Sequence, residues 1–193
     1  MTDIDLMCNC GQVKGTARLE QGEVGNNVVC FCEDCQSFAY YLERQDSILD
    51  AHGGTEIHQL PSAFVKLTHG QEQVRCMRLS EKGLYRWYAG CCNTPLANTA
   101  SAGMPFVGLI HNFKKSENRT DDSPEIHGYV YTKYAKGELP DSVASTSKFS
   151  ILVRILFKLL VWRARGYQKE NPFFNSEGEP VCDPIVIAPM PNR

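Results

Sequence analysis

The sequence predicts a mainly β domain followed by a C-terminal apolar helix and an extended tail. Over residues 8–113, short segments of alternating apolar and polar residues are separated by turn-forming residues, which is the pattern of half-buried strands. Cysteines cluster at three of the expected turns. One apolar run with helical spacing lies near the C-terminus.

Seven segments have strand character, and one short segment between them suits a helix. The expected strands are residues 13–19, 28–29, 57–60, 64–67, 74–79, 84–88 and 104–113. Residues 36–42 are expected to form one or two helical turns, after a short polar lead at residues 1–7. Gly108, inside the last strand, indicates a bulge or a close approach of another segment.

The C-terminal helix is expected over residues 148–165. Apolar residues cover most of its helical wheel, and Arg154 and Lys158 share a narrow polar stripe at i, i+4 spacing. Gly166 follows where a helix stop is expected. The residues after it have the aromatic and β-branched pattern of an extended tail.

The patterns divide the chain into a domain of residues 1–140 and a C-terminal segment, residues 141–193, packed on or beside it. Between Asp141 and Glu170, the stretch that contains this helix, all charged residues are basic. The helix has too few apolar residues to cross a bilayer. It could dock on the domain or on a second subunit, lie on an anionic membrane surface, or contact nucleic acid.

Composition limits the expected partners and the cellular compartment. A net charge of -2 over 193 residues gives no global case for nucleic-acid binding, so we expect no such partner. The N-terminus is acidic and lacks the basic and apolar regions of a signal peptide, which favours the cytoplasm. There, clustered cysteines are more typical of metal ligation than of disulfides, and the odd total of nine excludes complete pairing.

Seven of the nine cysteines fall into three groups: Cys8 and Cys10; Cys30, Cys32 and Cys35; and Cys91 and Cys92. A Cys-x-x-Cys turn brings two sulfurs to one point, and two such turns from distant segments can enclose a zinc ion. Pairing the first group with the last gives a four-ligand site. The middle group then stands alone, and three ligands without a fourth are typical of an open, catalytic zinc site.

Two other interpretations of the middle group remain, as free buried thiols or as a redox pair. Glu33 and Asp34 lie between its thiols, and their negative charge disfavours a reactive dithiol. A divalent ion would offset that charge. Cys76 and Cys182 belong to no group and are expected to be packing residues.

The order of the motifs resembles the glutathione-dependent formaldehyde-activating enzyme and centromere-protein-V family. The family pattern is Cys-x-Cys-Gly, then Cys-x-Cys-x-x-Cys, then an aromatic residue before Cys-x-x-Cys-Gly-Thr/Ser. This chain has Cys8 to Gly11, Cys30 to Cys35, and Tyr88 to Pro95 in that order. The likeness covers roughly residues 8–113.

The resemblance implies a β-tent of short antiparallel strands stapled by zinc. It also implies a structural zinc shared by the first and third motifs and a second zinc on the three middle thiolates. The founding activity joins formaldehyde to glutathione, so members are classed as carbon-sulfur lyases. Glutathione or another small thiol adduct is accordingly the expected ligand.

The chain departs from the family at two positions. Ala89 stands where the first thiol of the last motif is expected, which leaves Cys91 as the nearest fourth ligand beside Cys92. Neighbouring residues on a strand point to opposite faces, so Cys91 could join only through an irregular turn at Gly90. Phe31 stands where the family often has a histidine.

The five histidines have no metal-motif spacing. His52, in a loop beside Gly53 and Gly54, is the expected substrate contact. No catalytic residue is identified. The sequence thus favours a zinc protein of the carbon-sulfur lyase type acting on glutathione-aldehyde adducts. The alternatives are a zinc-stapled interaction module that uses helix 148–165 for a partner or membrane, and a thiol-redox protein.

Overall fold

The computed structural model describes residues 2–19, 25–115, 125–144 and 148–187, and within them it confirms the mainly β fold. The strands are β1 (Thr2–Met7), β2 (Lys14–Leu19), β3 (Asn26–Cys30), β4 (Thr55–Leu60), β5 (Val65–His69), β6 (Val74–Arg78), β7 (Tyr85–Ala89), β8 (Thr94–Thr99), β9 (Val107–Ile110), β10 (Gly128–Val130) and β11 (Ile185–Val186). The α-helices are α1 (Glu33–Tyr41), α2 (Gln45–Ile48), α3 (Asp141–Ala144) and α4 (Lys148–Ala164).

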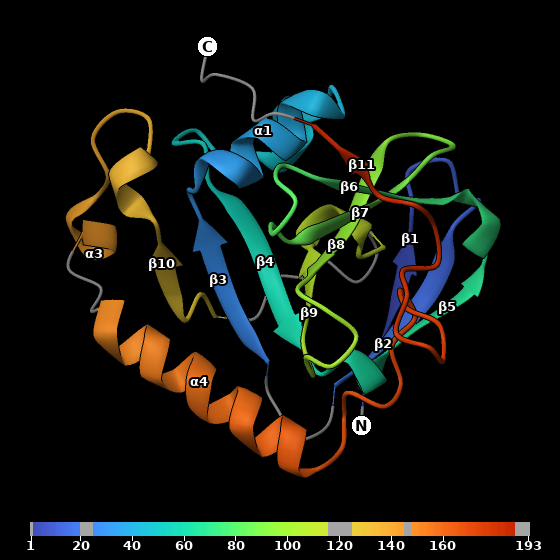
Figure 1. Cartoon of the computed structure of the whole chain (residues 1–193). Coiled ribbons are helices and arrows are strands. Elements are labelled where there is room, and N and C mark those ends of the chain that lie inside the picture. The colour runs from blue at the N-terminus through green and yellow to red at the C-terminus, as the bar shows by residue number, and fades with distance from the viewer. Residues whose placement is uncertain (1, 20–24, 116–124, 145–147, 188–193) are drawn as a thin grey trace.

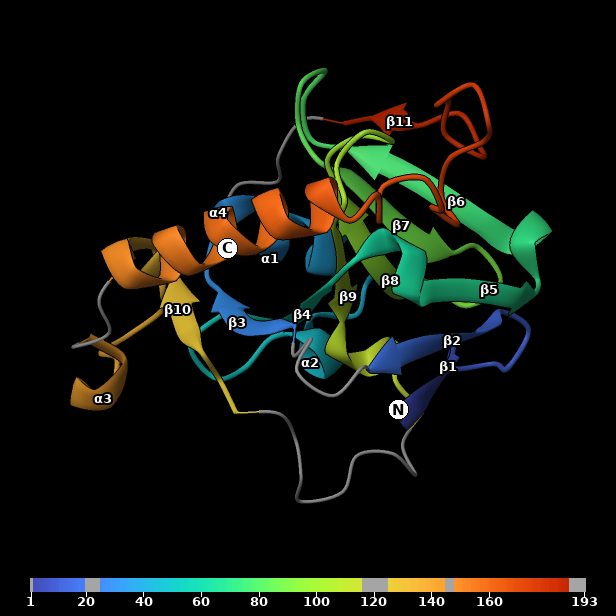
Figure 2. The same ribbon diagram turned by 90° about the horizontal axis from the view of Figure 1, so that it is seen from below.

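The strands form two sheets. A three-stranded sheet has the order β1-β2-β5, and an eight-stranded sheet has the order β10-β3-β4-β9-β8-β7-β6-β11. Neighbouring strands are antiparallel, except that β10 runs parallel to β3 and β11 parallel to β6. Figures 1 and 2 show α4 beside β10 and β3, on the side of the molecule away from the three-stranded sheet.

The seven expected strands are present, one of them shortened, and there are four additional ones: β1, β8, β10 and, in the tail, β11. The segment 104–113 is a strand only at β9, because a 3-10 helix at His111–Phe113 turns the chain and buries Phe113. The prediction that residues 1–7 are only a polar lead is wrong, because residues 2–7 form β1, an edge strand paired to β2. The pattern did not predict β8, because its Pro95 is typical of a turn, and it also did not predict the three-residue β10.

The tail belongs to the main core. Phe173 stacks on Trp87 with ring centroids 4.9 Å apart, and Phe174 meets the same indole edge-on at 5.7 Å. Both Trp87 and Phe173 have an exposed fraction of 0%. Burying aromatic rings of this size supplies about 2 kcal/mol or more each, so the tail contributes to the stability of the β domain.

Helix α4 docks through one side only. Ile151 and Trp162 on that side are 4% and 1% exposed. Gly128 in β10 lets the helix approach closely, because a Cβ there would collide with the side chain of Ile151. Arg154 adds a polar contact by donating from Nε to Asn26 Oδ1 at 2.9 Å.

Behind α4, His58 in β4 is a buried and uncharged histidine. It is 1% exposed, and neither ring nitrogen has a hydrogen-bond partner among the described residues. Burial, followed by the positive charges of Lys114, His127 and Lys158, lowers the pKa of His58 to about 3. A charged imidazole is therefore excluded from the folded protein at neutral pH.

We expect His58 to make the protein less stable in acid. Unfolded, it takes up a proton below its ordinary pKa of 6.5, whereas the folded chain resists protonation down to a pKa of about 3. Stability therefore falls as pH drops through this interval, by up to about 1.4 kcal/mol per pH unit from this group. Urea unfolding between about pH 4.5 and pH 7 measures the slope.

The matched comparison is His58→Leu against His69→Leu, since His69 is exposed. Cysteine thiols titrate in both variants, so the difference between the two slopes isolates His58. An unchanged slope in His58→Leu would contradict the assignment.

Candidate metal centre

Four cysteines from the two sheets meet at one point. The Sγ atoms of Cys8, Cys10, Cys91 and Cys92 all lie within 4.8 Å of one another. Individual separations are 3.6 Å for Cys8–Cys10, 3.9 Å for Cys8–Cys91, 3.3 Å for Cys10–Cys91 and 3.8 Å for Cys91–Cys92. We call this group the four-cysteine cluster.

The first half of the cluster is a tight turn between β1 and β2. The backbone N–H of Gly11 donates to the carbonyl of Cys8 at 2.9 Å, and Gly11 adopts φ +77°, a conformation that glycine adopts without strain. The backbone N–H of Val13 donates to Cys8 Sγ at 3.2 Å. The turn thereby points Cys8 and Cys10 to the same place.

The second half is the turn between β7 and β8, and it resolves the position of Cys91. The backbone N–H groups of Cys92 and Asn93 both donate to the carbonyl of Ala89, at 3.3 and 2.8 Å, and Asn93 adopts φ 53°. Strand alternation has ended at Ala89, so consecutive residues are free to point the same way. Cys91 therefore joins the cluster, which also keeps Cys92.

Thr94 and Arg44 hold this turn from outside. Thr94 Oγ1 accepts from the backbone N–H of Asn9 at 3.0 Å and lies 3.1 Å from Cys92 Sγ. Arg44 donates to the carbonyl of Cys92 at 2.6 Å. Burial acts to raise the pKa of Cys92, but hydrogen bonds from Thr94 and from the backbone of Cys10 outweigh it and lower the pKa to about 6.

The separations fit a tetrahedral thiolate site. Four sulfurs about 2.3 Å from a central zinc ion lie about 3.8 Å from one another, and the four values above scatter around that figure. Four ionised thiols this close would repel strongly without a cation. The four-cysteine cluster could therefore hold a metal ion.

Cys30, Cys32 and Cys35 form a second group, the three-cysteine cluster, whose Sγ atoms also lie within 4.8 Å of one another. Strand β3 delivers Cys30, and Cys32 is the N-cap of α1, with its Sγ accepting from the backbone N–H of Cys35 at 3.4 Å. Cys30 and Cys32 are 3.3 Å apart. Among the described residues no histidine, carboxylate or fourth cysteine completes the group, which could hold a metal ion with one position open.

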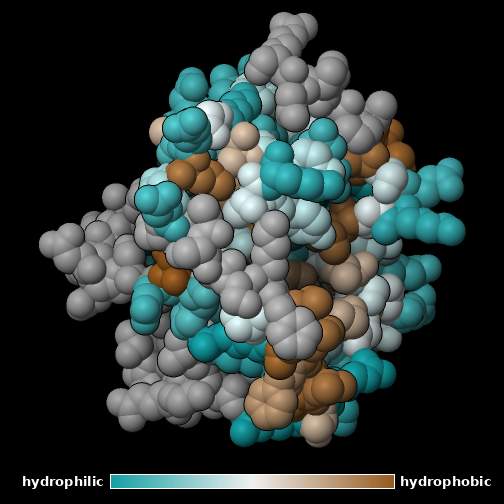
Figure 3. All heavy atoms as spheres, turned by 90° about the vertical axis from the view of Figure 1, so that its left-hand side faces the viewer, coloured by the Kyte–Doolittle hydropathy of each residue, from teal (hydrophilic) through white to brown (hydrophobic). Residues whose placement is uncertain are grey.

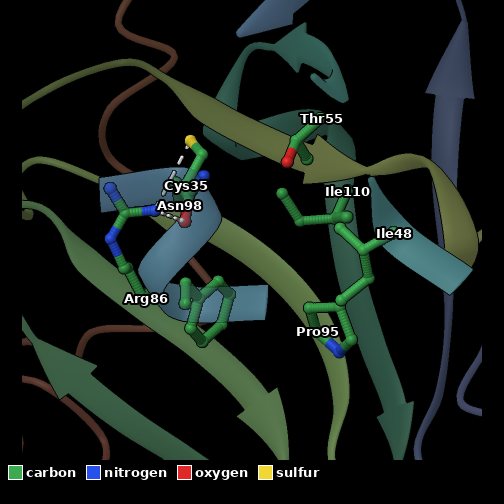
Figure 4. Close-up of a pocket in the computed structure, with 8 residues that line it drawn as sticks. Cys35, Ile48, Thr55, Arg86, Pro95, Asn98 and Ile110 are labelled. Atoms are coloured by element: carbon green, nitrogen blue, oxygen red, sulfur yellow. Dashed lines mark hydrogen bonds between the residues drawn. The ribbon is translucent and has the colours of Figure 1, made fainter. Parts of the chain in front are cut away.

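Arg86, which sequence reasoning missed, lies against this cluster. It is 1% exposed and reaches from β7 to within 3.7 Å of Cys35 Sγ and 3.5 Å of Asn98 Oδ1 (Figure 4). Its Nη2 lies 3.5 Å from Asp34 Oδ2. The hint available in the sequence is a lone arginine within an aromatic strand, since such a charge is buried only when it is paired.

The charges of the cluster and of Arg86 depend on each other. Hydrogen bonds from Cys30 and Cys32, together with the Arg86 guanidinium, hold the pKa of Cys35 well below its usual value. Sharing its proton with Cys32 and Cys35 raises the pKa of Cys30. Burial acts to lower the pKa of Arg86, but the thiolate of Cys35 reverses this and the pKa is raised. These shifts favour a thiolate at Cys35 beside Arg86 and a protonated thiol at Cys30.

Packing closes the inner side of the three-cysteine cluster and leaves an opening outside it. The side chains around Cys35 and Arg86 leave no room for a water molecule (Figure 4). Outside, a groove of about 320 Å³ is lined by residues 130–133 and by Ile151, Leu152 and Ile155 of α4. Val130 and Ile151 pack with Cys30, which places the groove beside the cluster.

Tyr131 connects the groove to the thiols. It is 59% exposed and adopts φ 58°. Burial and then the charge of Cys32 raise the pKa of its hydroxyl, so the phenol lies within electrostatic reach of the cluster. Sequence reasoning did not single out this residue, because only the folding of β10 beside β3 brings it near Cys32.

None of the remaining predicted residues belongs to the thiol set of either cluster. His52 contacts the carbonyl of Lys136 through Nδ1 at 3.0 Å, and no contact with a cluster thiol is seen for it; its role in substrate binding stays a prediction. Phe31 is 1% exposed and stacks on Tyr129 at 6.5 Å. Cys76 is buried in the main core and Cys182 packs against it.

Similarity to known proteins shows the family to which this chain belongs. A model of a family of unknown function, DUF6151, matches residues 1–184. The chain belongs to this family. Both cysteine clusters, α4 and most of the tail fall inside the matched range, so the C-terminal segment is part of the DUF6151 unit.

No curated protein matches the chain. Among solved structures, a crystal structure of a Rhodobacter sphaeroides protein matches with 14% identity and a TM-score of 0.45, over 63% of this chain and 96% of its own. The function of this DUF6151 protein must therefore be inferred from the chemistry of its two clusters.

We expect Cys91 to be the fourth ligand of the four-cysteine cluster. Cys91→Ser should release zinc from this cluster more readily than the wild type and lower the zinc content of the purified chain by up to about one ion, because a site with no open position loses one of its four ligands. Elemental analysis after dialysis against a weak chelator measures this. Cys182→Ser, outside both clusters, is the control; full zinc retention in Cys91→Ser would contradict the assignment.

We also expect Arg86 to stabilise the three-cysteine cluster. Arg86→Met leaves Cys35 and Asn98 buried without their cationic partner and should reduce stability by about 3 kcal/mol. Arg86→Lys, which keeps the charge but not the fork of donors, should recover part of the loss. Urea unfolding measures both, with the exposed Arg18→Met as control; equal stability of Arg86→Met and wild type would refute the role.

Proposed function

We propose that this protein is a zinc enzyme of the carbon-sulfur lyase type, acting on adducts between an aldehyde and a small thiol such as glutathione. The observation that carries the proposal is the three-cysteine cluster, whose thiols converge without a fourth protein ligand among the described residues. The four-cysteine cluster would hold a structural zinc, because its ligand shell is complete.

Zinc is the metal that suits these groups. Sets of three or four thiolates with tetrahedral separations select zinc over the oxygen-seeking divalent ions. Charge balance agrees with this choice. Three thiolates and one divalent ion leave a net charge of -1, and the buried Arg86, which lies beside Cys35 and also pairs with Asp34, offsets part of this negative charge.

The motif order adds support. Cys8 to Gly11, Cys30 to Cys35 and the turn before Thr94 follow the pattern of the glutathione-dependent formaldehyde-activating enzyme and centromere-protein-V family. Members of that family are commonly classed as carbon-sulfur lyases. We also place this protein in the cytoplasm, because clustered cysteines that bind metal are typical of a reducing compartment.

The residues around the cluster suit a small polar adduct with an apolar wall. When bound, zinc with an open position acts as a Lewis acid toward a thiolate or an aldehyde oxygen. The groove would receive the rest of the substrate. Tyr131, beside the thiols, would donate a hydrogen bond to it, and exposed Lys133 in the same lining would attract a substrate carboxylate.

One observation favours a second candidate, a zinc-stapled module without catalysis. Phe31 stands where related enzymes often have a histidine, and it is buried against Tyr129 rather than turned toward the groove. A protein that has lost a substrate contact in this way would keep both zinc ions for stability alone and bind no thiol at the open position.

Metal analysis followed by calorimetry separates the candidates. We expect two zinc ions per chain, glutathione binding to the zinc-loaded protein, and loss of that binding in Cys32→Ser but not in Cys182→Ser. Release of formaldehyde from its glutathione adduct then tests for turnover. Two zinc ions without thiol binding would favour the module, and a zinc-free protein with freely titratable thiols would exclude both.

A further inference from the structure

Helix α4 carries an apolar face that the domain does not cover. Its large side chains Leu152, Val153, Leu156, Phe157 and Leu160 are 47% to 69% exposed. Their spacing places them on one side of the helix, one above another over more than two turns. Figure 3 shows apolar side chains gathered on the lower part of this flank of the molecule.

The exposure does not come from a loosely attached helix. On the opposite side Ile151 and Trp162 are buried, and Arg154 is hydrogen-bonded to Asn26 of β3. The helix is thus fixed to the sheet while its outer apolar face is presented to the surroundings. Contiguous exposed apolar surface of this kind marks a binding surface for a protein or a membrane.

The charges beside the face distinguish these two occupants. Arg154 is exposed at one edge of it, whereas Lys158 is half-buried on the docked side, toward His58. Arg163 lies near the C-terminal end of the helix and donates to the carbonyl of Gly103 at 2.7 Å. Between Asp141 and Glu170 the sequence contains no acidic residue. A second copy of the chain would bring equal positive charge against this edge, whereas anionic phospholipid headgroups complement it.

We propose that α4 attaches this protein to an anionic lipid surface, lying in the plane of the interface. Leu156, Phe157 and Leu160 would enter the acyl region while the basic residues stay among the headgroups. Within the described residues no helix has the length and apolar character needed to span a bilayer, which fits attachment rather than insertion across it.

This arrangement also orients the groove. Leu152 belongs to the exposed face and to the groove lining, together with Ile155. The opening beside the three-cysteine cluster therefore borders the lipid-facing surface. The inference about α4 stands on exposure and charge, and it does not depend on whether either cluster carries out catalysis.

Vesicle flotation of the full zinc-loaded chain tests the proposal. We expect flotation with vesicles of phosphatidylcholine and phosphatidylserine, little with phosphatidylcholine alone, and weaker binding at higher salt. The double variant Phe157→Ser with Leu160→Ser should bind at least about tenfold more weakly, because two large apolar side chains could no longer enter the acyl region. Val181→Ser, 47% exposed in the tail, should bind like the wild type.

Circular dichroism and thermal unfolding verify that each variant folds. Absence of flotation with anionic vesicles, or equal flotation of wild type and the double variant, would overturn the proposal. So would a stable dimer in solution that the double variant dissociates, because a second copy would then cover the face.

Discussion

The meeting of two cysteine turns ties the three-stranded sheet to the eight-stranded sheet, and much of the domain is arranged around it. One turn follows β1 and the other joins β7 to β8. Four thiols within 4.8 Å of one another need shared protons or a bound cation, since their charges would otherwise repel. Thr94 and Arg44 fix the second turn, and the core that includes Trp87 lies directly behind it.

The three-cysteine cluster is built from different elements and offers a metal ion three thiols rather than four. Its thiols come from the end of one strand and the first turn of α1, and Arg86 from β7 lies against Cys35. A buried arginine is stable only beside a permanent negative partner. Arg86 has the Asp34 carboxylate at 3.5 Å and Cys35 Sγ at 3.7 Å as such neighbours, and its charge favours the thiolate form of Cys35, which is the form that binds metal.

Helix α4 links this cluster to the surroundings. Its inner side packs with the residues that surround Cys30, its N-terminal half lines the groove, and its outer side is apolar and exposed. A helix on a protein surface that faces water usually carries polar residues on its outer side. The outer side of α4 is apolar instead. The chain thus has one element that both lines the groove beside the candidate site and exposes an apolar face.

The sequence by itself determined the β character, most strand positions, the C-terminal helix and the grouping of seven cysteines, because these follow from periodicity and short-range spacing. Edge strand β1 and proline-containing β8 escaped prediction, since their local signals resemble loops. Only the tertiary structure decided that Cys91 joins the first cluster, that Arg86 and Tyr131 lie at the second, and that α4 leaves one apolar side uncovered. Each of these depends on contacts between segments far apart in the chain, or on a turn whose geometry no alternation rule describes.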